Sequence, residues 1–581
     1  MGRFLVRALA VFGFLALLLI VGLAGFAWWA SREFAGQRIE VPNEMILVAD
    51  WRNGIEEKPA GLGRFDFTSL EPEPSFPEIL LALERAVTDD RVKGVYVRLG
   101  GDGFGFAQAQ ELIEVVARLR SAGKTTVAYA DSFAEFGPGT IGYYVASGFE
   151  RIYIQPLGIV GLTGISIETP FVKPLLDQWG IELEVGQREE HKTALNSFTE
   201  ETLTPAHRET LNQLADQVYG QLVDGIASGR GLEPVQVIEL IDRGPLMAEE
   251  AASAGLLDGI MHRDELEDLL DEELSEGTGY FSLERYVKAS RREQAEDLPV
   301  IALVHAVGVI QADGGDDPLG GAGIQADRTA GAVKQAIEND SVDAIVLRVD
   351  SPGGSAVASE TIGFQVRQAR NAGKPVIVSM GNTAASGGYW ISMDADRILA
   401  SPGTITGSIG VIVGKPVTQE FWDDLGVNWE RVQRGENADL WSFVDDYDER
   451  SRARVEAFLD HTYDAFVQGV ARGRNMAADD VRRIAGGQVW SGRHALDRGL
   501  VDDLGGWLVA LDAAKQAAGI DTDEPVSVQP FPPPRDFTDS LLKSLEEGFV
   551  GVGALIRLQR WLGLNPYPGG QTLRAPSIVF R

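Results

Sequence analysis

An internal repeat constrains this chain more than any other feature of its sequence. The segment 92–99, Val-Lys-Gly-Val-Tyr-Val-Arg-Leu, matches the segment 342–349, Val-Asp-Ala-Ile-Val-Leu-Arg-Val. After a slip of four residues the match resumes, with Gly-Tyr-Tyr at 142–144 against Gly-Tyr-Trp at 388–390. Self-similarity over this distance predicts two related halves that share one fold.

The repeat also shows what each half lacks. The first half carries Thr140 where the second carries Ser386, and Leu-Gly-Gly-Asp at 99–102 stands where the second half has the turn Asp-Ser-Pro-Gly. Lys192 of the first half aligns within one residue of Ala438 in the second. Each half therefore keeps one member of a candidate pair, a lysine in the first and a serine in the second.

Ser386 lies in a setting that suits nucleophilic catalysis. It stands in Ala-Ala-Ser-Gly-Gly-Tyr-Trp, 384–390, and a glycine turn, Asp-Ser-Pro-Gly-Gly, precedes it at 350–354. Acyl transfer requires a serine with backbone amides nearby, because the oxyanion of the tetrahedral intermediate needs donors that are already in place. The alternative is that Ser386 is only a small residue that lets a helix pack closely against a strand.

Glycines flank this serine and form the preceding turn. Because a glycine backbone can approach a ligand without a side chain in the way, Gly353, Gly354 and Gly387 are the expected oxyanion donors. The sequence does not tell which two amides act. Asp350, at the end of the preceding strand, is interpreted as a carboxylate that bonds the turn, with a role in fixing Ser386 as the alternative.

Composition narrows the possible chemistry. The chain has no cysteine, which excludes disulfides, zinc–thiolate sites and cysteine nucleophiles. Its six histidines show no metal-ligand spacing, and no Gly-x-Ser-x-Gly elbow is present. We therefore expect neither a metal nor another cofactor. A formal net charge of -33 argues against a nucleic-acid partner.

Short apolar runs alternate with helix-like stretches in each half. Residues 344–349 and 375–379 have the pattern of buried strands, and 355–372 that of the helix between them. Repeated strand-turn-helix units predict an α/β fold with parallel strands and with ligands bound at the turns. Two longer stretches, 205–228 and 451–472, are predicted to be helices that brace the halves.

With these motifs, the chain resembles the signal peptide peptidase A family, also called protease IV, in its long tandem-repeat form. The resemblance covers nearly the whole chain and rests on Ala-Ser-Gly-Gly-Tyr-Trp at 385–390 and Asp-Ser-Pro-Gly-Gly at 350–354. It implies Ser386 as the nucleophile and Lys192 as the general base. Where the family has a Tyr-Lys-Ser-Ala-like context around this lysine, the chain has His-Lys-Thr-Ala at 191–194.

The same resemblance implies a tandem repeat of two ββα-spiral domains of the kind shared by Clp protease and the crotonases. It implies degradation of cleaved signal peptides and other apolar peptides, assembly as a homotetramer, and a catalytic body on the periplasmic side of the inner membrane. Two alternatives are a catalytically silent membrane scaffold and a crotonase-type acyl-CoA enzyme. The retained Ser386 and Lys192 argue against the first, and the apolar amino terminus argues against the second.

A lysine can act as a base only when it is neutral. Its ordinary pKa of about 10.4 must therefore fall by several units, and burial in an apolar pocket can cause such a shift. Lys192 would then take the Ser386 proton and return one to the leaving amine. A solvated lysine at a helix end is the alternative for Lys192. Lys415 is the alternative base, because it lies in the same half as the serine.

The amino terminus differs in kind from the rest of the chain. No charged residue occurs from Ala8 to Ser31, a stretch longer than the ~20 residues needed to cross a bilayer. Trp28 and Trp29 stand at its far end, where an aromatic belt is expected. We interpret 8–31 as a transmembrane anchor, with a cleaved signal peptide as the alternative.

These observations predict an order of domains along the chain. A short tail, 1–7, precedes the anchor, the first repeat domain spans 45–287, a charged linker 288–297, the second repeat domain 298–520, and a proline-rich tail 521–581. Apolar residues three and four positions apart predict an amphipathic helix in that tail, at Leu542, Leu545, Phe549, Val552 and Ile556.

Overall fold

The computed structural model describes residues 25, 39–58, 73–101, 103–135, 137–273, 277–292, 298–312, 323–533 and 573–574. The predicted anchor, apart from Gly25, and the amphipathic helix predicted in the carboxy-terminal tail lie outside the described residues. Among the helices of these ranges, none combines the length and the apolar character that crossing a membrane requires.

The first half of the chain forms a six-stranded sheet in which all strands are parallel. Its strand order is β8 (Gly259–Ile260), β4 (Arg151–Ile154), β3 (Thr125–Ala130), β2 (Val92–Leu99), β1 (Met45–Trp51) and β9 (Gly279–Ser282).

The second half repeats this order in an eight-stranded sheet. The corresponding strands are β20 (Asp503–Leu504), β16 (Arg397–Ala400), β15 (Val376–Ala385), β13 (Val342–Ser351), β10 (Val300–Val307) and β21 (Ser527–Phe531). The long strand β15 also pairs with β17 (Ile405–Gly407), which carries β19 (Val489–Ser491) antiparallel at the edge. The prediction of two related α/β halves with parallel strands is thus confirmed.

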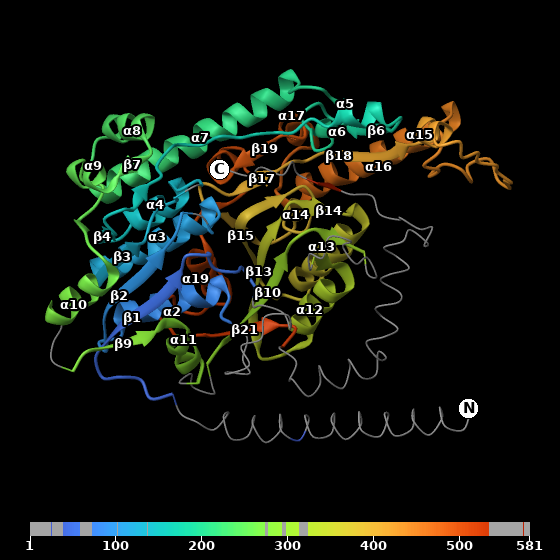
Figure 1. Cartoon of the computed structure of the whole chain (residues 1–581). Coiled ribbons are helices and arrows are strands. Elements are labelled where there is room, and N and C mark those ends of the chain that lie inside the picture. The colour runs from blue at the N-terminus through green and yellow to red at the C-terminus, as the bar shows by residue number, and fades with distance from the viewer. Residues whose placement is uncertain are drawn as a thin grey trace, which may run out of the picture.

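Helices separate the two sheets and cover their outer faces (Figure 1). Between the sheets lie α2 (Phe76–Thr88), α3 (Phe106–Ser121) and α19 (Trp507–Ala517), while α12 (Ala326–Glu338) and α13 (Ala356–Asn371) cover the far face of the second sheet. One apolar core runs through this central layer and includes Leu47 and Val95 of the first sheet with Val346 and Ile377 of the second. Burial of these side chains joins the halves into one body.

Alternation along β13 decides which side chains face this central layer. Ala344 and Val346 belong to the core shared by the two halves, whereas Ile345 and Leu347 face the second half's own helices. Arg348 continues the first row, so its side chain points between the halves.

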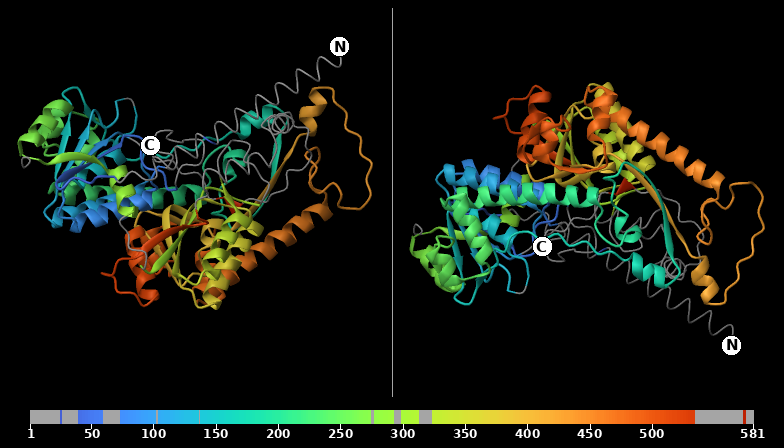
Figure 2. Two further views of the ribbon diagram at one scale, coloured as in Figure 1. Left: turned by 90° about the horizontal axis from the view of Figure 1, so that it is seen from below. Right: turned by 90° about the horizontal axis from the view of Figure 1, so that it is seen from above.

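A segment of the first half crosses over to the second. Strand β6 (Glu182–Arg188) pairs antiparallel with β18 (Val411–Val417), and Figure 2 shows this ribbon extending away from the first sheet. Helix α16 (Glu449–Gly473) packs against this ribbon, whereas α7 (Pro205–Arg230) contacts α4 (Thr140–Ser147) of the first half and β19 of the second. These two helices confirm those predicted at 205–228 and 451–472. The crossover carries the residues that follow β6, including Lys192, into the second half.

The remaining elements are short. They are α4 (Thr140–Ser147), β5 (Ile159–Val160), α5 (Lys173–Gln178), α6 (Asn196–Thr199), α8 (Pro234–Arg243), β7 (Leu246–Met247), α9 (Ala248–Ser253), α10 (Arg263–Glu273), α11 (Leu283–Arg292), β11 (Ile310–Gln311), β12 (Ile324–Gln325), β14 (Gly353–Gly354), α14 (Gly387–Trp390), α15 (Gln419–Asp424), α17 (Ala478–Ile484), α18 (Gly492–Asp497) and β22 (Leu573–Arg574).

Candidate active site

Ser386 occupies a sharp turn between β15 and the short helix α14. Its backbone has φ 56° and ψ -116°, a conformation that costs an L-residue free energy. The turn is held because the Ser386 amide donates to the Gly407 carbonyl oxygen at 2.8 Å. Tight packing behind it leaves no room for side chains, since a Cβ on Gly388 would lie 2.6 Å from the Ser351 carbonyl oxygen. The serine hydroxyl is therefore fixed in place by the surrounding backbone.

Lys192 reaches Ser386 from the first half of the same chain. Its Nζ lies 2.8 Å from Ser386 Oγ, although 194 residues separate the two in sequence. The same nitrogen donates to Ser408 through the carbonyl oxygen at 2.8 Å and Oγ at 3.0 Å. The structure thus brings the serine and the lysine together within one chain.

The second half forms the walls around this lysine. A Cβ on Gly487 would lie 2.6 Å from the Lys192 backbone nitrogen, and one on Gly410 would lie 3.3 Å from its Cδ. The His191 amide donates to the Gly486 carbonyl oxygen at 3.1 Å, which ties the lysine loop to the same glycine segment. Only residues without side chains allow the loop to approach so closely, and as a result Lys192 is fully buried.

Burial lowers the pKa of Lys192 from its ordinary value to about 7, and no charged neighbour contributes to the shift. The three oxygens around Nζ belong to hydroxyl and carbonyl groups, which accept hydrogen bonds without stabilising a full positive charge as a carboxylate would. A substantial fraction of this lysine is therefore neutral near pH 7.

Ser408 is a site residue that the sequence analysis missed. It has φ 52°, and its amide donates to the Gln488 carbonyl oxygen at 2.8 Å, so that its own carbonyl and hydroxyl both turn toward Lys192. The repeat held a signal for it, because Leu162 follows Gly161 in the first half where Ser408 follows Gly407 in the second. Only the half that carries Ser386 has a serine there.

The three glycines expected as oxyanion donors gather beside Ser386. Gly353 and Gly354 have φ 106° and 157°, backbone conformations open to glycine, and form β14. The Gly353 amide donates to Ser351 Oγ at 3.1 Å. A Cβ on Gly387 would lie 3.0 Å from the Gly354 nitrogen, so these two backbones pass close to each other.

Other candidates from the sequence lie in different surroundings. Lys415 is buried, but its Nζ donates to the Ser442 carbonyl oxygen at 2.9 Å and lies 4.3 Å from the centre of the Tyr447 ring. It therefore binds a loop of its own half. His191 places Nδ1 3.0 Å from Thr210 Oγ1, toward α7.

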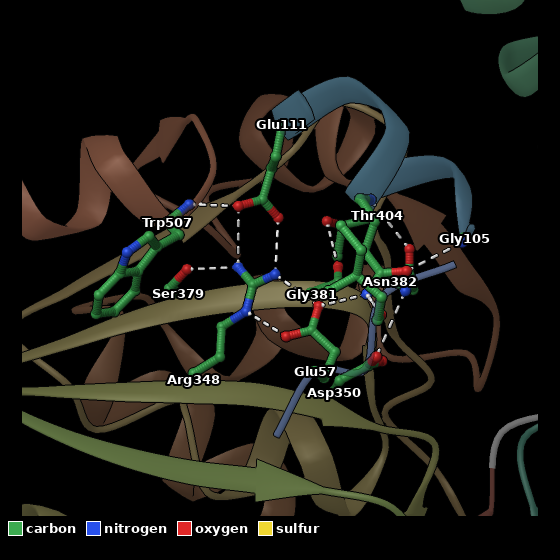
Figure 3. Close-up of polar contacts among 12 residues, drawn as sticks. Glu57, Gly105, Glu111, Arg348, Asp350, Ser379, Gly381, Asn382, Thr404 and Trp507 are labelled. Carbon is green, nitrogen blue, oxygen red and sulfur yellow. Dashed lines mark hydrogen bonds and ion pairs between the residues drawn. The ribbon is translucent and has the colours of Figure 1, made fainter. Parts of the chain in front are cut away.

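A second polar cluster lies between the two halves and joins side chains from both (Figure 3). The fully buried Arg348 guanidinium contacts both Glu57 and Glu111 of the first half at 2.8 Å, and donates to Ser379 Oγ at 2.9 Å. Glu111 also accepts from the Trp507 amide at 2.6 Å. Two carboxylates thus face one guanidinium where water is excluded.

Asp350 stands at the edge of this cluster. Burial, with a smaller contribution from the Glu57 carboxylate, raises the pKa of Asp350 to about 7. The backbone amide of Thr383 and the Arg348 charge act in the opposite direction, because both favour the ionised carboxylate.

Known proteins resemble this chain over most of its length. Residues 118–276 and 368–521 both match the model of "Peptidase family S49". Protease 4 of Haemophilus influenzae is 30% identical over 511 residues, covering 84% of this chain and 80% of that protein. Protease 4 of Salmonella typhi is 29% identical, with coverage of 83% and 80%, and the chloroplastic serine protease SPPA of Arabidopsis thaliana is 28% identical, with 83% and 72%. The first family match contains Lys192 and the second contains Ser386.

Proposed function

We propose a mechanism and a substrate class for this chain from one premise: it belongs to peptidase family S49, in its tandem form, and is a serine endopeptidase. In the mechanism, Ser386 is the nucleophile and Lys192 is the general base. The observation that carries the assignment is the 2.8 Å separation of Lys192 Nζ and Ser386 Oγ, with both residues fully buried.

The protons balance if Lys192 begins neutral. Two N–H bonds of its amine then donate to the carbonyl and hydroxyl oxygens of Ser408, which leaves the nitrogen lone pair directed at the Ser386 hydroxyl. As Ser386 Oγ attacks the peptide carbonyl carbon, Lys192 takes its proton. Ser408 is the positioning residue that keeps the lone pair aligned.

The ammonium formed in this step then serves as the acid. It gives its proton to the leaving amine nitrogen as the C–N bond breaks, and the acyl group remains on Ser386. Water next attacks the ester carbonyl while Lys192, neutral again, takes the water proton. Collapse of the second tetrahedral intermediate returns that proton to Ser386 Oγ and releases the carboxylic acid.

For the oxyanion, the amides of Gly354 and Gly387 are the favoured donors. Gly387 is the first residue of α14, so its N–H has no acceptor within the helix. The Gly353 amide already donates to Ser351 Oγ, which makes Gly353 the weaker candidate of the three glycines. Donors fixed by the backbone cost no reorganisation when negative charge develops on the carbonyl oxygen.

An extended peptide is the form of substrate that this site suits. Strand β14 pairs antiparallel with β22, the two residues Leu573 and Arg574, so a strand can lie along the glycine turn. A substrate that adds in the same way would be bound through its backbone, with side-chain pockets setting the preference. A similar protein of Enterococcus faecium is named a putative signal peptide peptidase. We infer that this chain degrades cleaved signal peptides and other apolar peptides.

The location and assembly of the enzyme are also part of this proposal. We propose that the segment 8–31 anchors it in the inner membrane, with the catalytic body on the periplasmic side and four copies assembled as a homotetramer. We also propose that each half is a ββα-spiral of the kind found in Clp protease and the crotonases. The matching strand order of the two sheets supports a duplicated domain of one type.

The test is cleavage of a fluorogenic signal-peptide-like substrate by the detergent-solubilised full chain. Ser386→Ala and Lys192→Met should each lower kcat by more than about 1,000-fold. Lys415→Met is the matched control, since it removes another buried lysine, and should stay within about threefold of the parent. Full activity in Lys192→Met, or an inert parent across several apolar peptides, would contradict the assignment.

A further inference from the structure

Strands β13 and β15 lose their regular register just before the active site. Val349 pairs with Met380, but Ser351 pairs with Ala384, so Asp350 alone faces the three residues 381–383. A bulge of this kind bends the longer strand and leaves backbone groups without ladder partners. Here it lies in the strand that leads directly into Ser386.

The Asp350 carboxylate fills the gap that the bulge creates. Its Oδ1 accepts from the Thr383 amide at 2.9 Å, and its Oδ2 accepts from Asn382 Nδ2 at 3.4 Å. Figure 3 shows Asp350 beside Asn382 and Gly381. A Cβ on Gly381 would lie 3.1 Å from Asp350 Cβ, so glycine at this position lets the carboxylate come close.

Asp350 also borders the glycine turn. The next residue, Ser351, accepts from the Gly353 amide through Oγ at 3.1 Å, and the Gly308 amide donates to the Asp350 carbonyl oxygen at 2.9 Å. One side chain therefore joins the turn expected to bind the oxyanion to the strand that carries the nucleophile.

The same network reaches the first half, which supplies Lys192. Asn382 Oδ1 accepts a hydrogen bond from the backbone N–H of Gln108 at 3.2 Å, and Gln108 lies in the first turn of α3. The fit is close, because a Cβ on Gly105 would lie 2.0 Å from Asn382 Oδ1. The Gln108 side chain in turn donates to Glu57 Oε1 at 3.1 Å.

We propose that Asp350 is a positioning residue of the catalytic site, which sets the glycine turn and Ser386 in register with the half that carries Lys192. This inference rests on the proposed function. Asp350 acts through the backbone of the turn and of β15, and does not touch the reacting atoms.

The hydrogen bonds run in one direction, and this gives the proposal a sharp test. Asn382 accepts from the Gln108 amide and donates to Asp350, so position 350 must present an acceptor to Asn382. In Asp350→Asn, the new amide can accept from Thr383, but its NH2 group faces the NH2 group of Asn382. If the Asn382 side-chain amide is rotated to present its oxygen to position 350, its NH2 group then faces the backbone N–H of Gln108.

The double variant Asp350→Asn/Asn382→Asp reverses the middle link. The amide at position 350 then donates to the carboxylate at position 382, which also accepts from Gln108. This carboxylate lies at the amino-terminal turn of α3, where negative charge is favoured. Total charge is unchanged, so recovery of activity in the double variant would report the direction of the hydrogen bonds.

The measurement is steady-state cleavage of the fluorogenic peptide by the full chain, with thermal unfolding of each variant. In Asp350→Asn, kcat should fall about 30-fold while KM stays within about threefold, because turn geometry matters most in the transition state. The double variant should return to within about fivefold of the parent. The control is Asp343→Asn on the same strand, whose exposed carboxylate accepts from the Val300 amide at 2.9 Å, and it should behave as the parent.

Two further readouts separate positioning from stability. The acid limb of the pH profile should stay in Asp350→Asn, since Lys192 rather than Asp350 produces it. If Asp350→Asn fails to fold, Asn382→Ala, which keeps the bond from Thr383, should still lower kcat about fivefold at unchanged KM. Parent-like kcat in Asp350→Asn, or a double variant that folds but stays as slow as the single variant, would overturn the proposal. An inert parent would instead overturn the proposed function, and this inference with it.

Discussion

The two repeats place different side chains at the same point of the fold, and only one of them leaves its hydroxyl available. Thr140 begins α4, and its Oγ1 donates to the Gly164 carbonyl oxygen at 3.0 Å and accepts from the Thr163 amide at 3.2 Å. Ser386 instead precedes α14 in a left-handed turn, and its Oγ meets Lys192. In the first half the hydroxyl stabilises a loop, whereas in the second it contacts the amine of Lys192.

A second difference concerns the arginine that both repeats keep. Arg98 pairs with Asp50 and Asp131 at the surface, and the side chains of these aspartates are 45% and 47% exposed. Its counterpart Arg348 is fully buried against Glu57 and Glu111. The first half balances its arginine with aspartates of its own, whereas the second half takes both its charge balance and its proposed catalytic base from the first.

The largest expected loss of stability comes from removing the buried arginine, Arg348. Arg348→Met leaves Glu57 and Glu111 buried without a cation, and loss of one partner from a buried ion cluster costs about 3–5 kcal/mol. Arg98→Met at the equivalent surface position should cost less than about 1 kcal/mol, because water screens the exposed pairs. Urea unfolding followed by tryptophan fluorescence measures both. Equal losses in the two variants would show that the second half does not depend on the first in this way.

Sequence patterns were sufficient for the parts of the fold that alternate regularly. The apolar runs at 344–349 and 375–379 gave β13 and β15, because burial on both faces of a parallel sheet leaves a strong signal. The repeat singled out Ser386 and Lys192, since each stands where its counterpart differs. That the two meet within one chain depends on the β6–β18 crossover, a long-range pairing that local patterns do not encode.

The interface between the halves was harder to predict. Arg98 and Arg348 occupy matching positions in matching strands, so nothing local distinguishes the partly exposed arginine from the fully buried one. Their surroundings differ because Glu57 and Glu111 approach from another part of the chain. Ser408 was missed for a similar reason, since its carbonyl and hydroxyl become relevant only when Lys192 arrives from the first half.

The second prediction, of intermediate size, concerns the pH dependence of kcat/KM, because Lys192 and Ser386 come from different halves and the lysine is buried between them. The pKa of Lys192 in the folded enzyme is about 7, below that of a free lysine, and only its neutral form accepts the serine proton. kcat/KM should therefore fall about tenfold per pH unit below this pKa and level off above it. Initial rates of peptide cleavage from pH 5 to 9 measure this fall on the acid side of the profile. Lys192→Arg, which stays protonated throughout, should be inactive at every pH, and an acid limb centred well below pH 6 would contradict the assignment.

The smallest expected effect compares the same exchange, alanine to glycine, at the two equivalent positions. Ser386 has φ 56° and ψ -116°, so Ser386→Gly should be about 1 kcal/mol more stable than Ser386→Ala, because glycine adopts this conformation without strain. Thr140 is helical, so Thr140→Gly should be about 0.5–1 kcal/mol less stable than Thr140→Ala. Urea unfolding of all four variants at pH 7 gives the differences in their free energies of unfolding. Opposite signs would locate the strain in the repeat that carries Ser386, whereas equal signs would mean that the turn at Ser386 stores none.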